Sequence, residues 1–190
     1  MNGYKKFIPI LLITAVLLTV TTVALFVAQY IENSKSVQTV ISELGYGGVI
    51  IIAIIAGINV IVPIPAVTLT PIFTTAGLLL PWIILSLTVG TLIADYIGYL
   101  FGHWSRTHIY KSYPGAVAYI EIIYTHHPHL IVPLVFLFAA FIPLPNEVLV
   151  IPLALLSVRW RLMILPLFFG NLINQTIYAY GIDSMYGWLF

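Results

Sequence analysis

Long uncharged apolar tracts, broken by prolines, make up most of this chain. No Asp, Glu, Lys or Arg occurs in residues 44–94, and further uncharged tracts run over residues 122–146 and 162–182. A helix that spans a bilayer needs about 20 apolar residues. Residues 82–102 and 162–182 provide that length, so each is predicted to form a transmembrane helix.

The apolar segments that precede these two helices are shorter and occur in pairs. Each pair forms two arms around a proline tip: residues 46–62 and 66–80 around Pro63 and Pro65, and residues 129–141 and 146–158 around Pro143 and Pro145. This form predicts re-entrant hairpins, because irregular backbone at membrane depth needs protein or a water-filled cavity to satisfy its polar groups. Arms that cross the membrane fully would give the same sidedness, and they remain an alternative.

A shift of 80 residues superimposes the two hairpins and the helices that follow them. The strongest matches share one ungapped register: Pro63 with Pro143, Pro65 with Pro145, and Gly90 with Gly170. We therefore predict repeat one over residues 44–106 and repeat two over residues 126–186. An interfacial helix over residues 107–125 is expected to join them.

The N-terminus has the order of a signal peptide, with lysines before an apolar run over residues 7–28. That run is longer than the usual signal-peptide core of about 7–15 residues. Phe26 also stands where cleavage after Ala28 would require a small residue. We expect an uncleaved transmembrane helix and a polar connector within residues 1–43, followed by a membrane domain over residues 44–190.

The basic residues indicate the orientation. Six of them fall on one side of the predicted topology: Lys5, Lys6, Arg106, Lys111, Arg159 and Arg161. The positive-inside rule then places the N-terminus in the cytoplasm and the C-terminus outside. The first hairpin enters from outside and the second from inside, so the two repeats are predicted to be inverted.

The composition agrees with a multi-pass integral membrane protein of all-α class. The chain is 61% hydrophobic and 7% charged, whereas about 25% of the residues in a soluble domain are charged. A net charge of +1 gives no broad basic surface for nucleic acid, and the absence of cysteine excludes disulfides and thiolate metal sites. No catalytic or cofactor motif was found, so we expect neither an enzyme nor a cofactor.

Two carboxylic acids lie within predicted membrane segments and are the first candidates for function. Asp95 lies inside the helix over residues 82–102, and Glu147 follows the second proline tip. Intramembrane acids are costly and usually face a cavity or a partner. Asp95 is therefore a candidate proton site or gate, or else a hydrogen-bonding partner of a neighbouring helix or hairpin. Glu147 is a candidate substrate or proton contact, or else a helix cap.

Two further patterns concern the long helices. Small residues recur every four positions along the first, including Gly90, Gly98 and Gly102, and this spacing is typical of close helix packing. The second carries a polar stripe that could line a cavity: Asn171, Asn174, Gln175 and Tyr178. Gln175 is the repeat mate of Asp95 and a candidate partner for it.

Three histidines lie near the entry to the second hairpin: His126, His127 and His129. No carboxylate or cysteine completes a metal site at ligand spacing. Interfacial anchoring or pH sensing is the favoured interpretation, and no metal site is predicted.

Three stretches resemble the DedA superfamily, also called SNARE-associated or VTT-domain membrane proteins: "PIPAVTLTPIFTTAG", "GTLIADYIGYLFGHWSR" and "FIPLPNEVLVIPLAL". The second is the most specific, since that family combines a glycine, an acid, a tyrosine and a G-Y-x-x-G run on one helix. The resemblance implies two facing, inverted re-entrant hairpins and the transport or scrambling of lipids such as phospholipids or polyprenyl phosphates. The chain departs from the best-known bacterial pattern, since residues 141–153 contain no arginine.

The leading functional hypothesis is a lipid translocator or scramblase in a prokaryotic plasma membrane, with membrane lipids and protons as partners. A proton- or cation-coupled transporter of a small solute is the first alternative, and a non-transporting membrane scaffold is the second. The oligomeric state is open, with a homo-oligomer among the possibilities.

Overall fold

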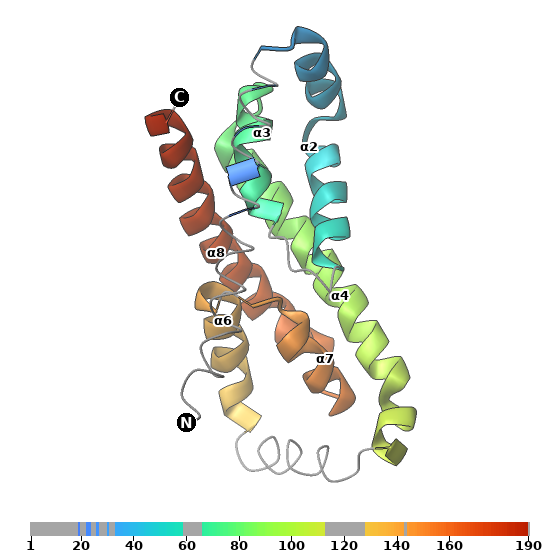
Figure 1. Cartoon of the computed structure of the whole chain (residues 1–190). Coiled ribbons are helices and arrows are strands. Elements are labelled where there is room, and N and C mark those ends of the chain that lie inside the picture. The colour runs from blue at the N-terminus through green and yellow to red at the C-terminus, as the bar shows by residue number, and fades with distance from the viewer. Residues whose placement is uncertain are drawn as a thin grey trace, which may run out of the picture.

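The computed structural model describes residues 33–58, 66–112, 128–142 and 144–189, together with Thr19, Thr22, Val23, Phe26 and Tyr30. In these ranges all regular structure is helical, which confirms the predicted all-α class (Figure 1). The elements are, in order, α2 (Lys35–Gly57), η1 (Ala66–Leu69), α3 (Thr70–Thr75), α4 (Leu80–Ser112), η2 (Pro128–Leu130), α6 (Ile131–Phe141), α7 (Glu147–Leu155) and α8 (Trp160–Leu189).

Several predicted features lie outside the described residues. They are most of the first transmembrane helix over residues 7–28, residues 113–125 of the interfacial helix, His126 and His127, and the tip prolines Pro63, Pro65 and Pro143. The first six residues of the interfacial segment are described, and they continue α4 to Ser112. No proline or glycine occurs between His103 and Tyr113, so nothing in that stretch stops the helix.

Three helices are long and apolar enough to cross a membrane. They are Gln38–Gly57, Leu80–Arg106 and Trp160–Ile182, and the latter two contain the spans predicted from the sequence. Large apolar side chains are exposed on all three, among them Ile55, Phe101 and Leu165. A lipid-facing surface has this character, so the fold is compatible with a membrane protein.

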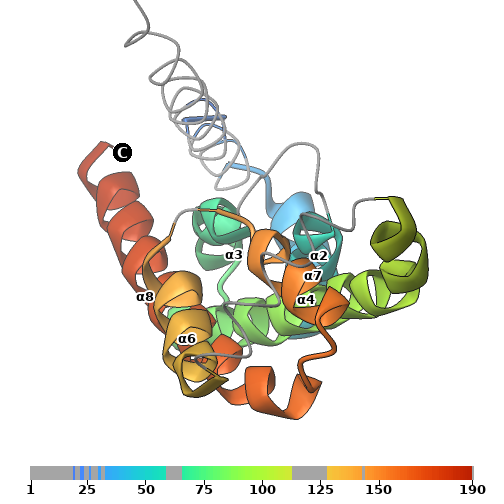
Figure 2. The ribbon, with the colours of Figure 1, turned by 90° about the horizontal axis from the view of Figure 1, so that it is seen from below.

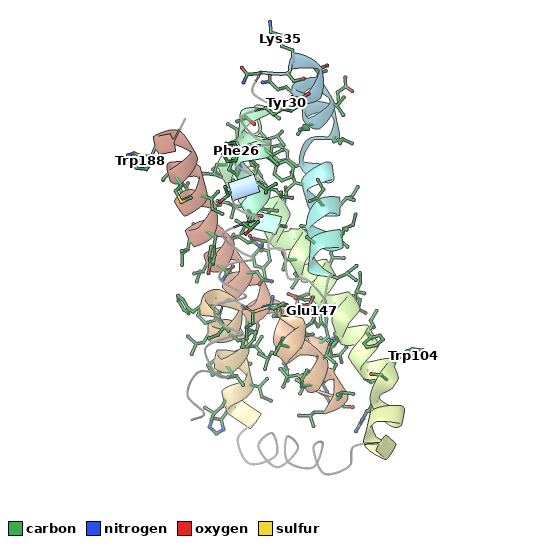
Figure 3. All side chains as sticks on the ribbon, in the orientation of Figure 1. Phe26, Tyr30, Lys35, Trp104, Glu147 and Trp188 are labelled. Carbon is green, nitrogen blue, oxygen red and sulfur yellow. The ribbon has the colours of Figure 1, made fainter. Side chains whose placement is uncertain are left out.

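Two of the four tryptophans of the chain lie on each long helix, Trp82 and Trp104 on α4 and Trp160 and Trp188 on α8. Trp82 and Trp104 are 22 residues apart on α4, which corresponds to about 33 Å of helix. Trp104 is 83% exposed and Trp188, near the end of α8, is 84% exposed (Figure 3). Tryptophan is enriched at the two interfaces of a hydrocarbon core about 30 Å thick. The spacing of Trp82 and Trp104 therefore suits an α4 helix that crosses it.

The arms of the predicted hairpins are short in the structure. α6 has 11 residues and α7 has 9, so their lengths are about 16 Å and 14 Å. α2 is longer but is kinked at Gly45 (φ 55°, ψ −151°), at the start of the predicted arm over residues 46–62. Positive φ favours glycine, because it has no Cβ to clash with the backbone. The described helix after the kink, residues 46–57, has 12 residues and is about 18 Å long.

The turns that end the two hairpins match at the 80-residue offset. Gly77 (φ 89°) and Ser157 (φ 59°) both adopt the left-handed conformation. The next amide bonds back into the helix in each case, Leu78 N to Phe73 O at 3.1 Å and Val158 N to Leu153 O at 3.0 Å. This is the Schellman geometry that closes a helix C-terminus. α4 and α8 then begin at residues 80 and 160.

The packing follows a two-fold pattern. Within each half, the first arm packs on the long helix: α2 on α4 and α6 on α8. Between the halves, α7 packs on α4, while η1 and α3 pack on α8. α4 and α8 cross each other and run in opposite senses, with α3 toward one end of the molecule and α6 and α7 toward the other (Figure 1). Figure 2 shows from below α6 along α8 and α7 over α4.

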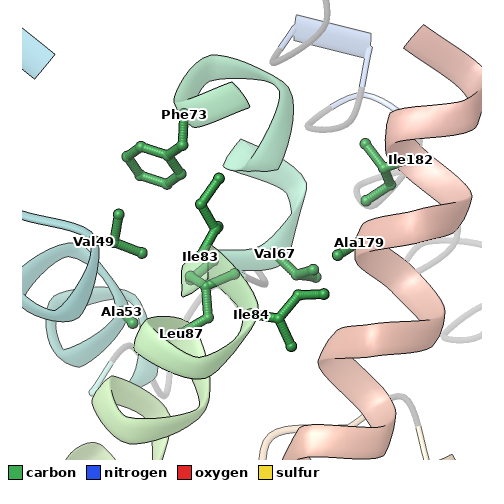
Figure 4. Packing of buried hydrophobic residues seen from close by; sticks show 10 residues of the cluster. Val49, Ala53, Val67, Phe73, Ile83, Ile84, Leu87, Ala179 and Ile182 are labelled. Carbon is green, nitrogen blue, oxygen red and sulfur yellow. The ribbon is translucent and has the colours of Figure 1, made fainter. Parts of the chain in front are cut away.

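Each half has its own apolar core. The first joins α2, η1, α3, α4 and α8 through residues such as Val49, Val67 and Leu87 (Figure 4). The second joins α6, α7 and α8 through residues such as Val135, Val150 and Met163.

Glycines allow the closest helix contacts. A Cβ on Gly90 would lie 2.7 Å from Ile50 O on α2, and one on Gly170 would lie 2.9 Å from Phe136 O on α6. A Cβ on Gly102 would lie 2.8 Å from Ile151 O on α7. Thus α2 packs against the predicted ridge of small residues near Gly90, and α7 packs against it near Gly102.

Alanine at Gly102 is expected to destabilise the protein, because its methyl group would press against backbone that cannot move independently. We expect a cost of about 1–3 kcal/mol, which thermal unfolding in detergent would measure. Gly181→Ala is the matched control, since a Cβ there meets nothing within 4 Å. It should be neutral or stabilising by up to about 1 kcal/mol. Equal melting temperatures for both variants would contradict the close packing of α7 on α4.

Candidate functional site

A buried cluster of polar side chains lies where α4 crosses α8. Asp95, on α4, is 1% exposed. Its Oδ2 accepts hydrogen bonds from Asn146 Nδ2 at 3.0 Å and from Asn171 Nδ2 at 2.9 Å. Asp95 is thus held by α8 and by the tip of the second hairpin together.

Asn146 was not singled out as a functional residue from the sequence. It precedes α7 in the position of a helix cap, but its side chain makes no capping hydrogen bond. Instead Nδ2 donates to Asp95 and also to Asn171 Oδ1, at 2.8 Å. The only signal in the sequence was an amide beside Glu147 at a proline tip, and a capping role would explain that equally well.

Gln175 does not bond Asp95, the partner suggested for it by the repeat. Its Nε2 donates to Thr91 Oγ1 at 3.2 Å, and Thr91 Oγ1 donates to Leu87 O at 2.9 Å. Gln175 Oε1 is buried and has no hydrogen-bond donor among the described residues.

These contacts obey the same two-fold pattern as the helices. The 80-residue offset relates Thr91 to Asn171 and Asp95 to Gln175. The Asn171–Asp95 bond and the Gln175–Thr91 bond are therefore equivalents across the crossing. The symmetry breaks at the hairpins, because Asn146 corresponds to Ala66, which has no polar side chain.

Glu147 adds a second buried acid beside the cluster. It is 7% exposed, begins α7, and lies at mid-height in the molecule (Figure 3). Gly98 leaves room for it, since a Cβ there would lie 3.2 Å from Glu147 Cγ. A helix N-terminus stabilises negative charge, so capping and ligand contact both remain compatible with this position.

The four residues of the polar stripe on α8 have different neighbours and different exposure. Asn171 and Gln175 belong to the crossing, whereas Asn174 Nδ2 donates to Ala140 O at 3.2 Å, near the end of α6. Tyr178 is 41% exposed. The four residues therefore do not line a single buried surface.

The other predicted positions are more peripheral. Pro145 is half-buried, and its carbonyl accepts Val148 N at 3.1 Å, which closes the turn into α7. His129 lies exposed in η2. Across the described ranges no three histidine, cysteine or acidic residues come together as a metal site.

Aromatic and basic residues of α4 bind the turn between α7 and α8. Tyr99 OH donates to Val158 O at 3.0 Å, and Arg106 Nη1 donates to Ser157 Oγ. The Tyr99 ring also lies 5.4 Å from that of Trp160. These contacts hold one end of the second hairpin to α4, while the Asn146 contact holds its tip.

The cluster offers a polar surface deep within apolar helices. It combines two buried acids with amides that both donate and accept. Such a set can hold a proton or exchange hydrogen bonds with a polar group that passes between the helices. Comparison of the chain with protein-family models, with curated proteins and with solved structures gives no match.

Proposed function

We propose that this protein is a multi-pass membrane protein of the DedA type that moves lipids between leaflets. In this proposal a lipid headgroup passes the polar cluster at the crossing of α4 and α8, while its acyl chains stay in the bilayer. The observation that carries the proposal is the buried Asp95–Asn146–Asn171 cluster, which lies where a hairpin tip meets both long helices.

The proposed architecture consists of two inverted re-entrant hairpins, each followed by a transmembrane helix. Three observations support it: the short arms α6 and α7, the matching Schellman turns 80 residues apart, and the opposite senses of α4 and α8. Broken helices that meet near the membrane midplane are a recurrent feature of transporters. The orientation follows the basic residues, with the N-terminus inside a prokaryotic plasma membrane and the C-terminus outside.

A lipid suits the cluster better than a soluble solute for a structural reason. The described surface includes an open groove of about 400 Å³ between α6 and the first half of α8. Its lining contains no polar surface: Val132, Pro133, Phe136, Leu165, Pro166 and Phe169. An acyl chain can lie there while the headgroup exchanges hydrogen bonds with Asp95 and its amides.

A proton-coupled transporter is the second candidate, and the two buried acids favour it. Asp95 and Glu147 come from different elements and approach the same crossing, as carboxylates of a proton relay do. Coupled transport requires an ion gradient, whereas scrambling does not.

The test uses purified protein in liposomes that contain acyl-labelled phospholipid, with dithionite added outside. Scrambling predicts that bleaching proceeds well beyond the outer-leaflet half without any gradient. Movement of the labelled lipid that occurs only after a pH gradient is imposed would show proton-coupled lipid transport in place of scrambling. Bleaching that stops at the level of protein-free liposomes under both conditions would overturn lipid movement for the lipids tested, and polyprenyl phosphate would be tested next under the same two conditions.

A further inference from the structure

The two halves of the α4–α8 crossing are equivalent in their helices but not in their hairpins. In one half, Asn146 donates to Asp95 and to Asn171. The equivalent residues in the other half are Ala66, Gln175 and Thr91. Ala66 is buried at the start of η1, which packs on α8 as the two-fold pattern requires. Its methyl group cannot donate the hydrogen bonds that Asn146 provides.

The side-chain carbonyl oxygen of Gln175 is the acceptor that lacks a hydrogen-bond donor in this half. The residue is only 7% exposed, and its Oε1 has no donor among the described residues. A buried carbonyl oxygen without a partner is unfavourable, and such groups in native proteins usually bond protein or water.

Three threonine hydroxyls on α3, α4 and α8, which pack together in this half, donate to backbone carbonyl oxygens. Thr91 Oγ1 donates its hydrogen to Leu87 O, and Thr70 Oγ1 donates to Val67 O at 2.6 Å. Thr176 Oγ1 donates to Leu172 O, also at 2.6 Å. Each hydroxyl has a single hydrogen, so none of the three can also donate to Gln175.

We propose that this second half of the crossing, formed by Ala66, Thr91 and Gln175, binds one small hydrogen-bond donor at Gln175 Oε1. The donor is an O–H or N–H group and takes the place that the Asn146 amide fills in the other half. Two sources carry this chemistry: an ordered water molecule, or a hydroxyl or amine on a lipid headgroup in transit. The lipid source rests on the proposed function, whereas the water source does not.

A stability measurement tests the half-site independently of transport. Ala66→Asn supplies the missing amide, and Ala66→Leu has similar bulk without a donor. We expect Ala66→Asn to melt above Ala66→Leu by several degrees, and this difference should disappear when Gln175→Leu is also present. Ala66→Ser adds only one oxygen, so it provides the same comparison against wild type if asparagine does not fit. A half-site is refuted if neither donor variant shows stabilisation that depends on Gln175.

A transport measurement identifies the source. Acyl-labelled phosphatidylglycerol and phosphatidylmethanol carry the same charge, but only the first has headgroup hydroxyls. A lipid donor predicts that wild type moves phosphatidylglycerol faster and that Ala66→Asn abolishes this preference. Equal rates in wild type, together with the Gln175-dependent stabilisation, identify water. If wild type moves neither lipid, the proposed function fails for both probes while the stability comparison still decides the half-site.

Discussion

Replacing Asp95 with asparagine is expected to slow lipid movement while leaving the fold intact. The asparagine Oδ1 can still accept from Asn146 and Asn171, so the network keeps its geometry and loses only the carboxylate. We expect the initial flipping rate to fall about tenfold, as a barrier raised by roughly 1.4 kcal/mol would produce. The measurement is dithionite bleaching in liposomes without a gradient.

Asp95→Leu provides the contrast that separates charge from hydrogen bonding. Leucine removes the acceptor and leaves the buried Asn171 Nδ2 without a hydrogen-bond partner. This loss should lower the free energy of unfolding by about 1–3 kcal/mol. We expect this variant to melt below Asp95→Asn by roughly 2–4 °C for each kcal/mol. Full flipping activity in Asp95→Asn would exclude a role for the carboxylate in transport, whatever the stability of Asp95→Leu.

The second large effect is expected at Asn146. Asn146→Leu removes one donor from Asp95 and leaves Asn171 Oδ1 without its partner, at a cost of about 1–3 kcal/mol. The tip of the second hairpin also loses its polar contact with α4 and α8, so we expect flipping to slow as well. Thermal unfolding and bleaching would be measured on the same preparation.

Leu144→Ala is the control for this substitution. Leu144 belongs to the same tip, is 42% exposed, and has no polar side chain to contribute to the cluster. It should change the melting temperature little. If Leu144→Ala destabilised the protein as much as Asn146→Leu, the effect would reflect general packing of the tip rather than the Asp95 network.

The sequence predicted the long helices and the all-helical class because these depend on local hydrophobicity and length. The 80-residue register could also be seen in the sequence. Gly90 and Gly170 each let a neighbouring helix approach closely, so both halves need a glycine at the same place. Of the four tip prolines only Pro145 is described, and it lies in the turn into α7. The end of α4 was harder to place, because the charges at Arg106 and Lys111 indicate an interface but do not break a helix.

The partners of Asp95 could not be predicted from the repeat alone. Gln175 is its mate by sequence, but mates across a two-fold axis need not touch. Where two helices cross in opposite senses, contacts join positions on either side of the axis, here Asp95 with Asn171 and Thr91 with Gln175. Asn146 joins the cluster only because α7 packs on the other half of the molecule, which is a tertiary effect that no local pattern contains.

A lipid with a reactive headgroup would show whether headgroups reach the polar cluster at the second hairpin tip. The chain has no cysteine, so single cysteines can be placed without background. Leu144→Cys lies at the tip, and Ile177→Cys lies on α8 outside the apolar groove, with 55% of Ile177 exposed. A lipid with a maleimide headgroup should label Leu144→Cys much faster than Ile177→Cys if headgroups pass the tip. Equal labelling of the two, or labelling of Ile177→Cys alone, would contradict a headgroup path between the hairpins.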